Sequence, residues 1–488
     1  MPDLRNLTFD NTYARLGPAF ARPVEPTPLR GPRAVAWNPD AAELLGIGVG
    51  AAEDPFWVEA FSGNAPLPGA EPVAMLYGGH QFGSWVPQLG DGRAILLGEV
   101  RAPTGKWDLH LKGGGPTPFS RGFDGRAVLR STIREYLGSE AMHGLGIPTT
   151  RALCIVGSDE PVRRETVETG ASLVRLAPTH VRFGSFEVFA ARGQHDHLRT
   201  LADHVIAGHF PHLEGEPDRH ARFLDEVVAR TARLVARWQN AGWAHGVLNT
   251  DNMSVLGLTL DYGPFGFMDD YDPAFIPNHS DHGGRYAFNR QPAIGLWNLS
   301  ALAQALLPLM DRERAVAALD GYEPAFADEY MARLRAKLGL REARDEDGDL
   351  AGDLFELLAA SRVDFTRFWR MLGGFSEDGQ GANGAIRDLF LDWAGWGAWA
   401  ERYRARLLAE GSVATERRAA MDAVNPLYVL RNYLAEQAIR MAEEDRDYSE
   451  VERLRKLLSD PFTEQPGMEA YAEPPPDWGR RLVISCSS

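Results

Sequence analysis

The residues best suited to catalysis lie in one short polar stretch, HGVLNTDNMS, at positions 245–254. Asp251 and Asn252 stand side by side in it, and Asp261 follows in the sequence TLDYG. A carboxylate can accept a proton from a reacting hydroxyl group. Carboxylate and amide oxygens can also hold the metal ions that neutralise phosphate charge. The simpler alternative is that Asn-Thr-Asp-Asn forms a polar turn, which these residue types favour.

The spacing within this stretch resembles the catalytic loop of protein kinases. Asn252 follows His245 by seven positions, as in the kinase pattern H-R-D-x-x-x-x-N, and Asp261 stands where the kinase D-F-G would follow. The position of the kinase catalytic Asp is taken by Val247, which cannot accept a proton. Either the protein is inactive or another base has taken over, and Asp251 is the candidate for that base.

A lysine and a glutamate upstream fit the same pattern. Lys112 ends a predicted strand, and Glu135 follows 23 residues later on a helix predicted over 131–142. Kinases use such a pair to contact nucleotide phosphates. For either residue alone, a solvated side chain on the surface is the alternative.

Two glycine-rich stretches flank the lysine, GDGR at 90–93 and GGGPT at 113–117. Glycine lets the backbone approach a phosphate closely and leaves its N–H groups unobstructed. Neither stretch matches G-x-x-x-x-G-K-[ST], so a P-loop is excluded. Gly-Asp-Gly by itself is also typical of an ordinary turn.

The charge of the chain as a whole argues against nucleic acid and anionic membranes as partners, whereas a local arginine cluster favours a polyphosphate. The formal net charge is −16, which is unsuited to a surface that grips nucleic acid or an anionic membrane. Arginine is nevertheless concentrated near the predicted site, at Arg121, Arg126, Arg130, Arg134, Arg175 and Arg182. Guanidinium groups bind phosphate in a fork geometry, so this cluster predicts a polyphosphate pocket. The alternative for several of them is a salt bridge at the rim.

Hydrophobic periodicity predicts the elements that must position these residues. Segments 94–100 and 107–112 predict a hairpin in which Leu109 and Leu111 face one side and His110 and Lys112 the other. Residues 223–238 place apolar side chains on one face of a helix. Further helices are predicted over 296–307, 394–408, 428–441 and 449–458. The aromatic concentration of Trp393, Trp396, Trp399 and Tyr403 is predicted to belong to the core rather than to a partner surface. A strand-rich region followed by a helix-rich one favours two lobes with a cleft between them.

Composition places the chain in a broad class. Its 488 residues are 44% hydrophobic, as in a folded protein, and no uninterrupted apolar run is long enough to span a bilayer. Only two cysteines occur, which excludes a disulfide framework and an all-cysteine metal site and indicates a reducing compartment. The first residues lack the apolar core of a signal peptide. We therefore expect a cytoplasmic protein.

Long blocks of sequence resemble the selenoprotein O family of kinase-like proteins. The resemblance runs from about residue 72 to the last residue and rests on YGGHQFGSWVPQLGDGRAILLGE, DLHLKGGGPTPFSRGFDGRAVLRSTIREYL, LVRLAPTHVRFGSFE, HGVLNTDNMSVLGLTLDYGPFGFMD, NPLYVLRNYLAEQAI and a C-terminal CSS. It implies an α+β, protein-kinase-like bilobal fold. The implied parts are a strand-rich N-lobe (71–200), a helical C-lobe with the catalytic and metal loops (201–390), and a C-terminal helical extension and tail (391–488). Turn-rich stretches ahead of the resemblance predict an irregular N-terminal wrap (1–70), and the tail is predicted to be extended after its three prolines.

The resemblance also implies an activity, that of a protein adenylyltransferase. Such an enzyme transfers AMP from ATP to Ser, Thr or Tyr hydroxyls of proteins and releases pyrophosphate. ATP in this family lies reversed relative to kinases, which would account for Val247. Asp251 would be the base, and Asn252 and Asp261 would bind Mg²⁺ or Mn²⁺. The residues implied to bind or position ATP are Gly90, Gly92, Arg93, Lys112, Asp124, Gly125, Glu135, Arg175, Arg182 and Asp261. The expected partners are ATP and protein substrates, with no nucleic acid or membrane, and the expected state is a monomer.

The cysteines depart from the family pattern. Some relatives carry selenocysteine at the third position from the end, where this chain has Cys486. Bacterial relatives often carry a cysteine that can pair with it, at the position held here by Pro277. That pairing cannot form in this chain. Cys154, within ALCIV, is predicted to be a buried core residue.

Two other functions stay open at the level of sequence. A small-molecule or protein phosphotransferase would share the H-G-x-L-x-x-x-N pattern but would need an Asp in place of Val247. A non-catalytic, nucleotide-binding pseudokinase would not need to keep Lys112, Glu135, Asn252 and Asp261 together.

Overall fold

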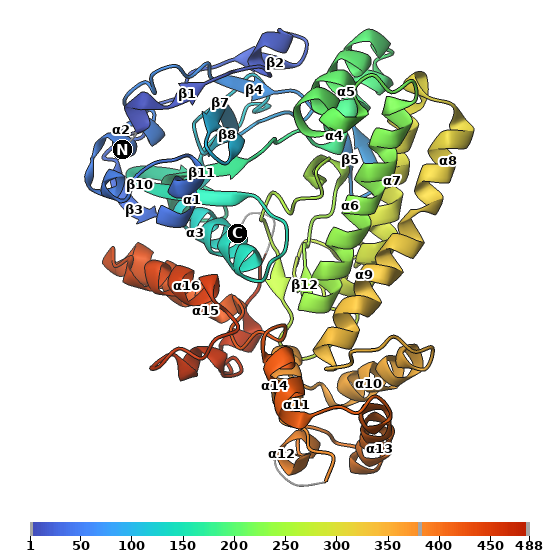
Figure 1. The fold of residues 1–488 in the computed structure, drawn as a ribbon. Helices are drawn as coiled ribbons and strands as arrows, with labels where there is room; N and C mark the ends of the chain where they lie inside the picture. The colour runs from blue at the N-terminus through green and yellow to red at the C-terminus, as the bar shows by residue number, and fades with distance from the viewer. Residues whose placement is uncertain (1–2, 379–382, 485–488) are drawn as a thin grey trace.

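An antiparallel sheet fills the N-terminal part of the molecule, and helices make up most of the rest (Figure 1). The computed structural model describes residues 3–378 and 383–484, and within these nine strands form this sheet. They are β1 (Thr8–Phe9), β2 (Ala21–Pro23), β3 (Arg33–Trp37), β4 (Val73–Met75), β7 (Ala94–Ala102), β8 (Gly105–Lys112), β9 (Ala127–Val128), β10 (Arg151–Arg163) and β11 (Val167–Ala177). Their order is β2-β4-β7-β8-β11-β10-β3, with β1 paired to β7 and β9 to β11. The architecture is a mixed α+β one, as the sequence predicts.

The predicted hairpin is confirmed as β7 and β8, and its alternation decides what each face of the sheet carries. Leu109 and Leu111 are buried on the face that packs against the helices α1 (Pro39–Leu44) and α2 (Phe56–Phe61). Lys112 lies on the other face and stands opposite Leu173 of β11, which packs in the same hydrophobic cluster as the helix α3 (Leu129–Gly144). His110 stands opposite Arg175 of β11. Polar side chains are therefore brought together on the side of the sheet that α3 covers.

Sixteen α-helices lie in the described residues, and six of them match helices that the sequence predicts. The sixteen are α1 (Pro39–Leu44), α2 (Phe56–Phe61), α3 (Leu129–Gly144), α4 (Phe183–Ala191), α5 (His195–His209), α6 (Arg219–Ala241), α7 (Gln291–Leu306), α8 (Arg312–Asp320), α9 (Tyr322–Lys337), α10 (Asp347–Ser361), α11 (Phe365–Leu372), α12 (Asn383–Arg387), α13 (Trp393–Ala409), α14 (Ala414–Asp422), α15 (Asn432–Arg440) and α16 (Ser449–Ser459). Helices α15 and α16 return to pack against α3. The last part of the chain thus supports a helix that carries Glu135.

Helix α6 leads the chain into the polar stretch at 245–254. Its buried face includes Phe223, Val227, Val235 and Trp238, as predicted. The helix ends at Gly242, whose φ of +66° is the left-handed conformation of a C-terminal cap. The two-residue strands β12 (Trp243–Ala244) and β13 (Gly266–Phe267) then pair. The loop between them holds Asp251, Asn252 and Asp261.

Helices α9 to α13 enclose a second hydrophobic cluster, at the bottom of Figure 1. Trp396, Trp399 and Tyr403 are buried in it, as the sequence predicts for this aromatic segment. Trp393, which belongs to the same segment, is 58% exposed, so the prediction that it is core is wrong. It occupies the first turn of α13, where Arg387 of α12 lies over its ring, 4.5 Å from the ring centre.

Three local predictions are corrected. The first 70 residues, expected to be irregular, contribute β1, β2 and β3 to the main sheet, because their partners lie far away in the sequence. The helix predicted over 428–441 begins only at Asn432. The segment after the prolines at 474–476 is not simply extended, since Gly479–Arg481 forms a turn of 3-10 helix.

One helical run departs from the expectation that nothing in the chain could span a bilayer. In the described part of the chain, Phe288–Leu309 is long and apolar enough to do so by length and composition alone. The helix α7 within it packs against α4, α6 and α8. Its buried residues include Leu299, Leu302 and Leu306. A core helix of a folded domain has the same composition, and this packing is that of a core helix.

Candidate functional site

A cavity of about 760 Å³ opens between the sheet and the loop that joins β12 to β13. Ten of the twelve site residues that the resemblance to the family implies line it: Gly90, Gly92, Arg93, Lys112, Asp124, Gly125, Arg175, Asp251, Asn252 and Asp261. The other two, Glu135 and Arg182, are almost fully buried and bind residues of this lining. Segments spread over more than 170 positions of the chain thus meet in one place.

Lys112 and Glu135 form the ion pair that their spacing predicts. Lys112 ends β8, Glu135 lies in the second turn of α3, and the two side chains are hydrogen-bonded in the interior. Burial lowers the pKa of Lys112, and Glu135 opposes that effect. The second oxygen of Glu135 accepts a hydrogen bond from Nη1 of Arg175, at 3.1 Å. One glutamate therefore orients two cations toward the cavity.

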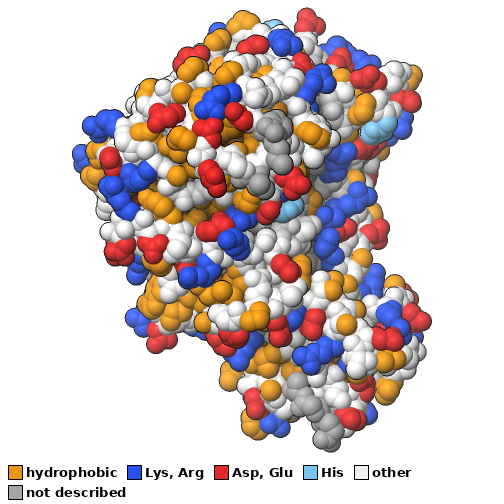
Figure 2. Space-filling model, turned by 60° about the vertical axis from the view of Figure 1, so that its left-hand side comes forward, with side chains coloured by type: hydrophobic (Ala, Val, Ile, Leu, Met, Phe, Trp, Pro, Cys, Tyr) orange, Lys and Arg blue, Asp and Glu red, His pale blue; other side chains and the backbone are white. Residues whose placement is uncertain are grey.

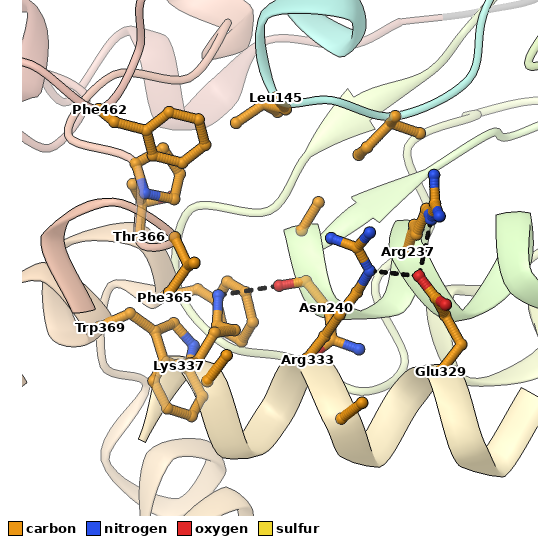
Figure 3. A pocket seen from close by; sticks show the side chains of 16 residues that line it. Leu145, Arg237, Asn240, Glu329, Arg333, Lys337, Phe365, Thr366, Trp369 and Phe462 are labelled. Carbon is orange, nitrogen blue, oxygen red and sulfur yellow. Dashed lines mark hydrogen bonds and ion pairs between the residues drawn. The ribbon is translucent and has the colours of Figure 1, made fainter. Parts of the chain in front are cut away.

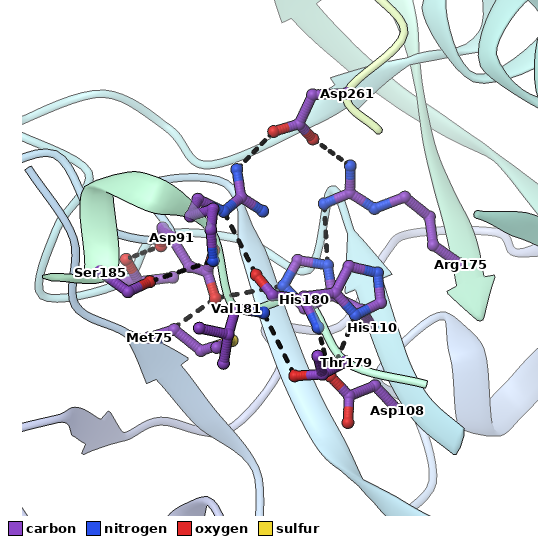
Figure 4. A network of polar contacts seen from close by, with 12 residues as sticks. Met75, Asp91, Asp108, His110, Arg175, Thr179, His180, Val181, Ser185 and Asp261 are labelled. Atoms are coloured by element: carbon purple, nitrogen blue, oxygen red, sulfur yellow. Dashed lines mark hydrogen bonds and ion pairs between the residues drawn. The ribbon is translucent and has the colours of Figure 1, made fainter. Parts of the chain in front are cut away.

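Asp261 is held by two arginines (Figure 4). Arg175 binds one of its carboxylate oxygens and Arg182 the other. Burial alone would raise the pKa of Asp261, but Arg182 and Arg175 outweigh it and hold that pKa well below the ordinary value. The residue adopts a φ of +60°, which is strained for a side chain other than glycine. Asp261 is therefore a permanent negative charge in a constrained position.

A chain of hydrogen bonds connects Asp261 to the glycine loop (Figure 4). Arg175 Nη2 donates to His110 Nδ1 at 2.8 Å, and His110 Nε2 donates to Asp91 at 3.1 Å. The bond from Arg175 leaves His110 as the neutral tautomer, and burial lowers its pKa. Asp91 also accepts the backbone N–H of Met75. The loop at 90–93 is thus linked to Asp261 through Asp91, His110 and Arg175.

Asp251 has surroundings opposite to those of Asp261. It lies in the 3-10 turn η5 (Thr250–Asn252) and is 6% exposed. Burial raises its pKa to about 7, while a hydrogen bond from Gln81 and the charge of Arg182 lower it. Gln81 Nε2 donates to Oδ2 at 3.1 Å, and Oδ1 has no partner among the described residues. A carboxyl group with this pKa can accept a proton at neutral pH.

The hairpin of β5 (Gly79–Gln81) and β6 (Ser84–Val86) lies across η5 and supplies Gln81. The backbone N–H of His80 donates to Thr250 Oγ1 at 2.7 Å, which ties the hairpin to the turn. The block YGGHQFG therefore contacts both Asp251, through Gln81, and the turn that carries it, through His80.

Buried hydrogen bonds hold the loop that carries Asp251. His245 Nε2 donates to the carbonyl of Leu260 at 3.0 Å. Gln291, at the start of α7, accepts from the N–H of His245 and donates to the carbonyl of Trp243, at 2.9 Å each. Asn298 of α7 donates to the carbonyl of Leu248 at 3.0 Å. His245 and α7 are therefore structural supports of this loop.

The glycines of the lining are required by close packing. Gly90 has a φ of +73°, and a Cβ there would lie 2.5 Å from the ring of Phe119. Gly125 has a φ of +66°, and a Cβ there would lie 2.0 Å from the carbonyl oxygen of Gly115. A larger residue at either position would displace the backbone that borders the cavity.

Several arginines near the site bind protein groups. Arg126 pairs with Glu160, Arg130 pairs with Glu168, and Arg134 lies over the ring of Phe265. Of these three, only Arg130 forms a partly exposed salt bridge, the alternative given above, because Arg126 and Arg134 are buried. Asp124, expected to contact ATP, is paired with Arg164 at 2.8 and 3.0 Å. That pair lowers the pKa of Asp124. Arg93, Arg121 and Arg163 also line the cavity.

The residues present suit a hard divalent cation. Asn252 Nδ2 donates to the carbonyl of Val247 at 2.9 Å, which commits its amide nitrogen and leaves its oxygen as a ligand atom. Asp261 adds carboxylate oxygens, and oxygen ligands are those that Mg²⁺ and Mn²⁺ prefer. Over 3–378 and 383–484, no three His, Cys, Asp or Glu side chains gather as a metal site. Nucleotide phosphates and water would have to complete the coordination.

Three residues of this site were not predicted to take part in it. Gln81 and Asp91 stand within motifs that the sequence analysis quotes, and His110 was only placed on the same side of its strand as Lys112. The alternation of β8 indicated that His110 faces the site. For Gln81 no local signal exists, because it contacts a residue 170 positions away.

The cysteines do not enter this site. Cys154 lies in β10, is 1% exposed and is a free thiol, so the prediction of a core residue is confirmed. Burial raises the pKa of its thiol well above the ordinary value, which leaves it unreactive. Cys486 lies outside the described residues.

Comparison with known proteins gives matches over nearly the whole chain. A family model described as "Protein adenylyltransferase SelO" matches residues 3–459. The chain is 61% identical to a protein nucleotidyltransferase YdiU of Myxococcus xanthus, over the full length of both chains. It is 57% identical to one from Thioalkalivibrio sulfidiphilus and 56% identical to one from Thiobacillus denitrificans, again over the full length of each.

Proposed function

The chain belongs to the SelO family of protein adenylyltransferases, and on that premise we propose that it transfers AMP from ATP to Ser, Thr or Tyr hydroxyl groups of other proteins. The resemblance noted in the sequence is confirmed at the level of the family, and with it the general activity, protein nucleotidyl transfer from ATP. The residue roles and the acceptor hydroxyls are our proposal.

The observation that carries the proposal is the contrast between two carboxyl groups in one cavity. Asp251 has a pKa of about 7, raised by burial. Asp261, held by two arginines, stays ionised. Sites that perform acid–base chemistry at neutral pH commonly contain such a pair, in which one group exchanges a proton and the other remains charged.

In the proposed reaction Asp251 accepts the proton of the acceptor hydroxyl. The hydroxyl oxygen then bonds to the α-phosphorus of ATP, and the bond from that phosphorus to the bridging oxygen of pyrophosphate breaks. The products are the AMP-modified protein, pyrophosphate and the proton on Asp251. Val247, which also lines the cavity, cannot take this part.

The cationic lining is suited to the triphosphate. Lys112 and Arg175, both oriented by Glu135, would stabilise charge on the leaving pyrophosphate. The backbone at Gly90 and Gly92 and the side chain of Arg93 would meet other phosphate oxygens, and Arg182 would position Asp261. Asn252 and Asp261 would hold Mg²⁺ or Mn²⁺, which supplies further neutralisation of phosphate charge when bound.

The fold supports the proposal by its arrangement. We propose that the strand-rich part (71–200) and the helical part (201–390) correspond to the two lobes of a kinase-like fold, with the cavity between them. Residues 1–70, whose short strands join the sheet, precede them, and the C-terminal extension (391–488) follows. We also propose that the protein acts as a monomer in the cytoplasm, on ATP and protein substrates. Its two cysteines and its net charge of −16 support that setting.

Position-specific labelling of ATP tests the reaction. The protein is incubated with a cell lysate, Mg²⁺ or Mn²⁺, and ATP labelled at the α- or the γ-phosphate. We expect label on protein from the α-position alone. Label from the γ-position alone would mean a phosphotransferase, and absence of label from both would mean a nucleotide-binding scaffold.

The substitution Asp251→Asn tests the proposed base. It keeps the shape of the side chain, so ATP binding should persist while transfer falls by at least about a hundredfold. Asp349→Asn, at an exposed position of α10, is the matched control and should transfer normally. Normal transfer by Asp251→Asn would assign the proton to another group.

A further inference from the structure

A second cavity, of about 340 Å³, lies between the C-terminal end of α6, the helices α9 and α11, and the loop after α3. It shares no lining residue with the cavity described above. Figure 3 shows Phe365, Trp369 and Phe462 on one side, Arg237, Arg333 and Glu329 on the other, and Lys337 between them. Its volume is in the range of small-molecule sites, and apolar walls with a few polar groups are typical of them.

Lys337 is the unusual member of this lining. It is one of only four lysines in the chain and is 5% exposed. Its Nζ donates to the backbone carbonyl of Asn240 at 2.9 Å and lies 4.7 and 5.1 Å from the ring centres of Trp369 and Phe365. Burial lowers its pKa to about 7. An ammonium group has three N–H donors, so two are left for other acceptors.

The charges around the cavity are unbalanced. Glu329 accepts from Nε of Arg237 at 2.8 Å and from Nε of Arg333 at 2.6 Å. The lining therefore holds three cations and one carboxylate, and among the described residues no carboxylate pairs with Lys337. The remaining wall, from the loop after α3 and from Val424, Pro426 and Phe462, carries no charge. A buried cation without a counter-ion is costly, and a bound anion would remove that cost.

The aromatic side indicates the rest of the ligand. Phe365 and Trp369 are buried and Phe462 is half-buried, and their rings provide an apolar surface next to the ammonium group. Trp369 also keeps a buried Nε1–H that has no acceptor within the described part of the chain. A purely inorganic anion would leave these rings without contact. A ligand with both a charged end and a flat apolar body would use the whole lining.

We propose that this cavity is a binding site for a small organic anion with an aromatic body, whose negative group pairs with Lys337 and whose rings pack against Phe365 and Trp369. The site is separate from the catalytic cavity and does not depend on the proposed reaction. The competing role of Lys337 is to cap the last turn of α6 through the carbonyl of Asn240, a purely structural one. If Lys337 binds an anion, the cavity should prefer a negatively charged ligand over a neutral one of the same shape. If Lys337 only caps the helix, the cavity should show no such preference.

Binding of 1-naphthoate, compared with its uncharged isostere 1-naphthamide, tests the proposal. Both are titrated calorimetrically into the full-length protein in the presence of a non-hydrolysable ATP analogue, which occupies the catalytic cavity. We expect naphthoate to bind at least about tenfold more tightly than naphthamide. We expect Lys337→Met, which keeps the apolar stem, to lose that preference. Lys456→Met, which removes an exposed lysine of α16, should bind naphthoate like the natural protein.

The affinity of the cavity for naphthoate should decrease with rising pH. Protonated Lys337 binds the anion, so affinity should fall as pH rises above about 7 and the free lysine loses its proton. The other charged groups that face the cavity are Arg237, Arg333 and Glu329. Burial would raise the pKa of Glu329, but its two arginines outweigh that effect and lower it, so Glu329 stays ionised over this range. The dependence on pH should therefore vanish in Lys337→Met.

A second measurement covers the case in which Lys337→Met fails to fold. Limited acetylation of the natural protein, followed by mass spectrometry, should show that naphthoate protects Lys337 but not Lys456. Three results would each overturn the proposal and leave Lys337 as a helix cap. They are equal affinity of the natural protein for naphthoate and naphthamide, naphthoate affinity that Lys337→Met does not change, and acetylation of Lys337 that naphthoate does not slow.

Discussion

Asp251 and Asp261 are ten residues apart in one loop, yet their surroundings move their pKa values in opposite directions. Burial dominates at Asp251, where the hydrogen bond from Gln81 offsets only part of it. Two arginines dominate at Asp261. The same side chain can thus serve as a proton acceptor in one position and as a constant charge in the other.

The rate of AMP transfer should follow the ionisation of Asp251. Since the deprotonated form accepts the proton, the rate should rise with pH to about 7 and level off above it. Gln81→Leu removes a hydrogen bond that stabilises the charged form. We expect it to move this rise toward higher pH by roughly one unit, because such a bond contributes about 1.5 kcal/mol. The measurement is the pH profile of transfer at saturating ATP.

The control for this experiment is Gln88→Leu, at an exposed position between the same hairpin and Gly90. Its profile should match that of the natural protein. A Gln81→Leu profile that keeps the same midpoint would show that the group titrating in the profile is not Asp251.

At the scale of elements, two loops and one helix hold the site. The glycine loop at 90–93 packs on Phe119 and is bound through Asp91 to His110. The loop from β12 to β13 is tied to the start of α7 by Gln291. Through these contacts, helices and strands fix the positions of site residues that lie in loops.

Gly90→Ala should distort the first of these loops. Its φ of +73° and the 2.5 Å approach to Phe119 leave no room for a Cβ. We expect the free energy of unfolding to fall by roughly 1–3 kcal/mol and ATP affinity to weaken. Denaturant unfolding and calorimetric titration with ATP measure the two effects. Gly122→Ala is the matched control, with a φ of +86° and nothing within 4 Å of the added carbon, so its ATP affinity should be unchanged.

Gln291→Leu should loosen the second loop. It leaves the N–H of His245 and the carbonyl of Trp243 buried without their side-chain partner. The expected loss of stability is about 1–3 kcal/mol, together with slower AMP transfer. Gln304→Leu, on the exposed side of the same helix, should change neither. Unaltered stability of Gln291→Leu would mean that the loop does not depend on α7.

On the scale of the whole molecule, charged side chains of both signs are mixed over one face of the surface (Figure 2), whereas hydrophobic side chains gather in separate clusters. Basic and acidic side chains are interspersed over the face shown in Figure 2, while cations line both cavities. The hydrophobic side chains form separate clusters, and the one enclosed by α9 to α13 includes residues on both sides of position 390. Helix α9 contributes to this cluster and also packs against α6. Helix α9 therefore links this cluster to the rest of the molecule.

Trp399→Ala should destabilise this cluster before the remainder of the molecule. Trp399 is 2% exposed and stacks between Trp396 and Tyr403, at 5.1 and 5.0 Å. Replacing a buried tryptophan with alanine typically costs about 3–5 kcal/mol. Hydrogen exchange should accelerate in α10, α11 and α13 and stay slow in β7, β8 and α3. Acceleration that spreads evenly through the sheet would mean a single cooperative unit.

Local patterns in the sequence determined much of this protein. The hairpin β7–β8 and the helices α3, α6, α7, α13 and α16 follow from alternation and helical periodicity. Lys112, Asp251, Asn252 and Asp261 follow from motif spacing, whereas Asp124 and Gly125 were implied only by the resemblance to the family. These signals are visible because they depend on residues a few positions apart. The short strands of the first 70 residues were missed, because a strand of two to five residues has no period of its own and is defined by a distant partner.

Tertiary structure alone decided which carboxyl group titrates near neutral pH and which lysine lacks a counter-ion. Asp251 owes its raised pKa to burial under a hairpin 170 positions away, and Asp261 owes its lowered pKa to arginines 86 and 79 positions away. Lys337 resembles any helical lysine in the sequence, and only the packing of α6, α9 and α11 buries it. Desolvation and Coulomb interactions depend on distance in space, which residue order does not specify.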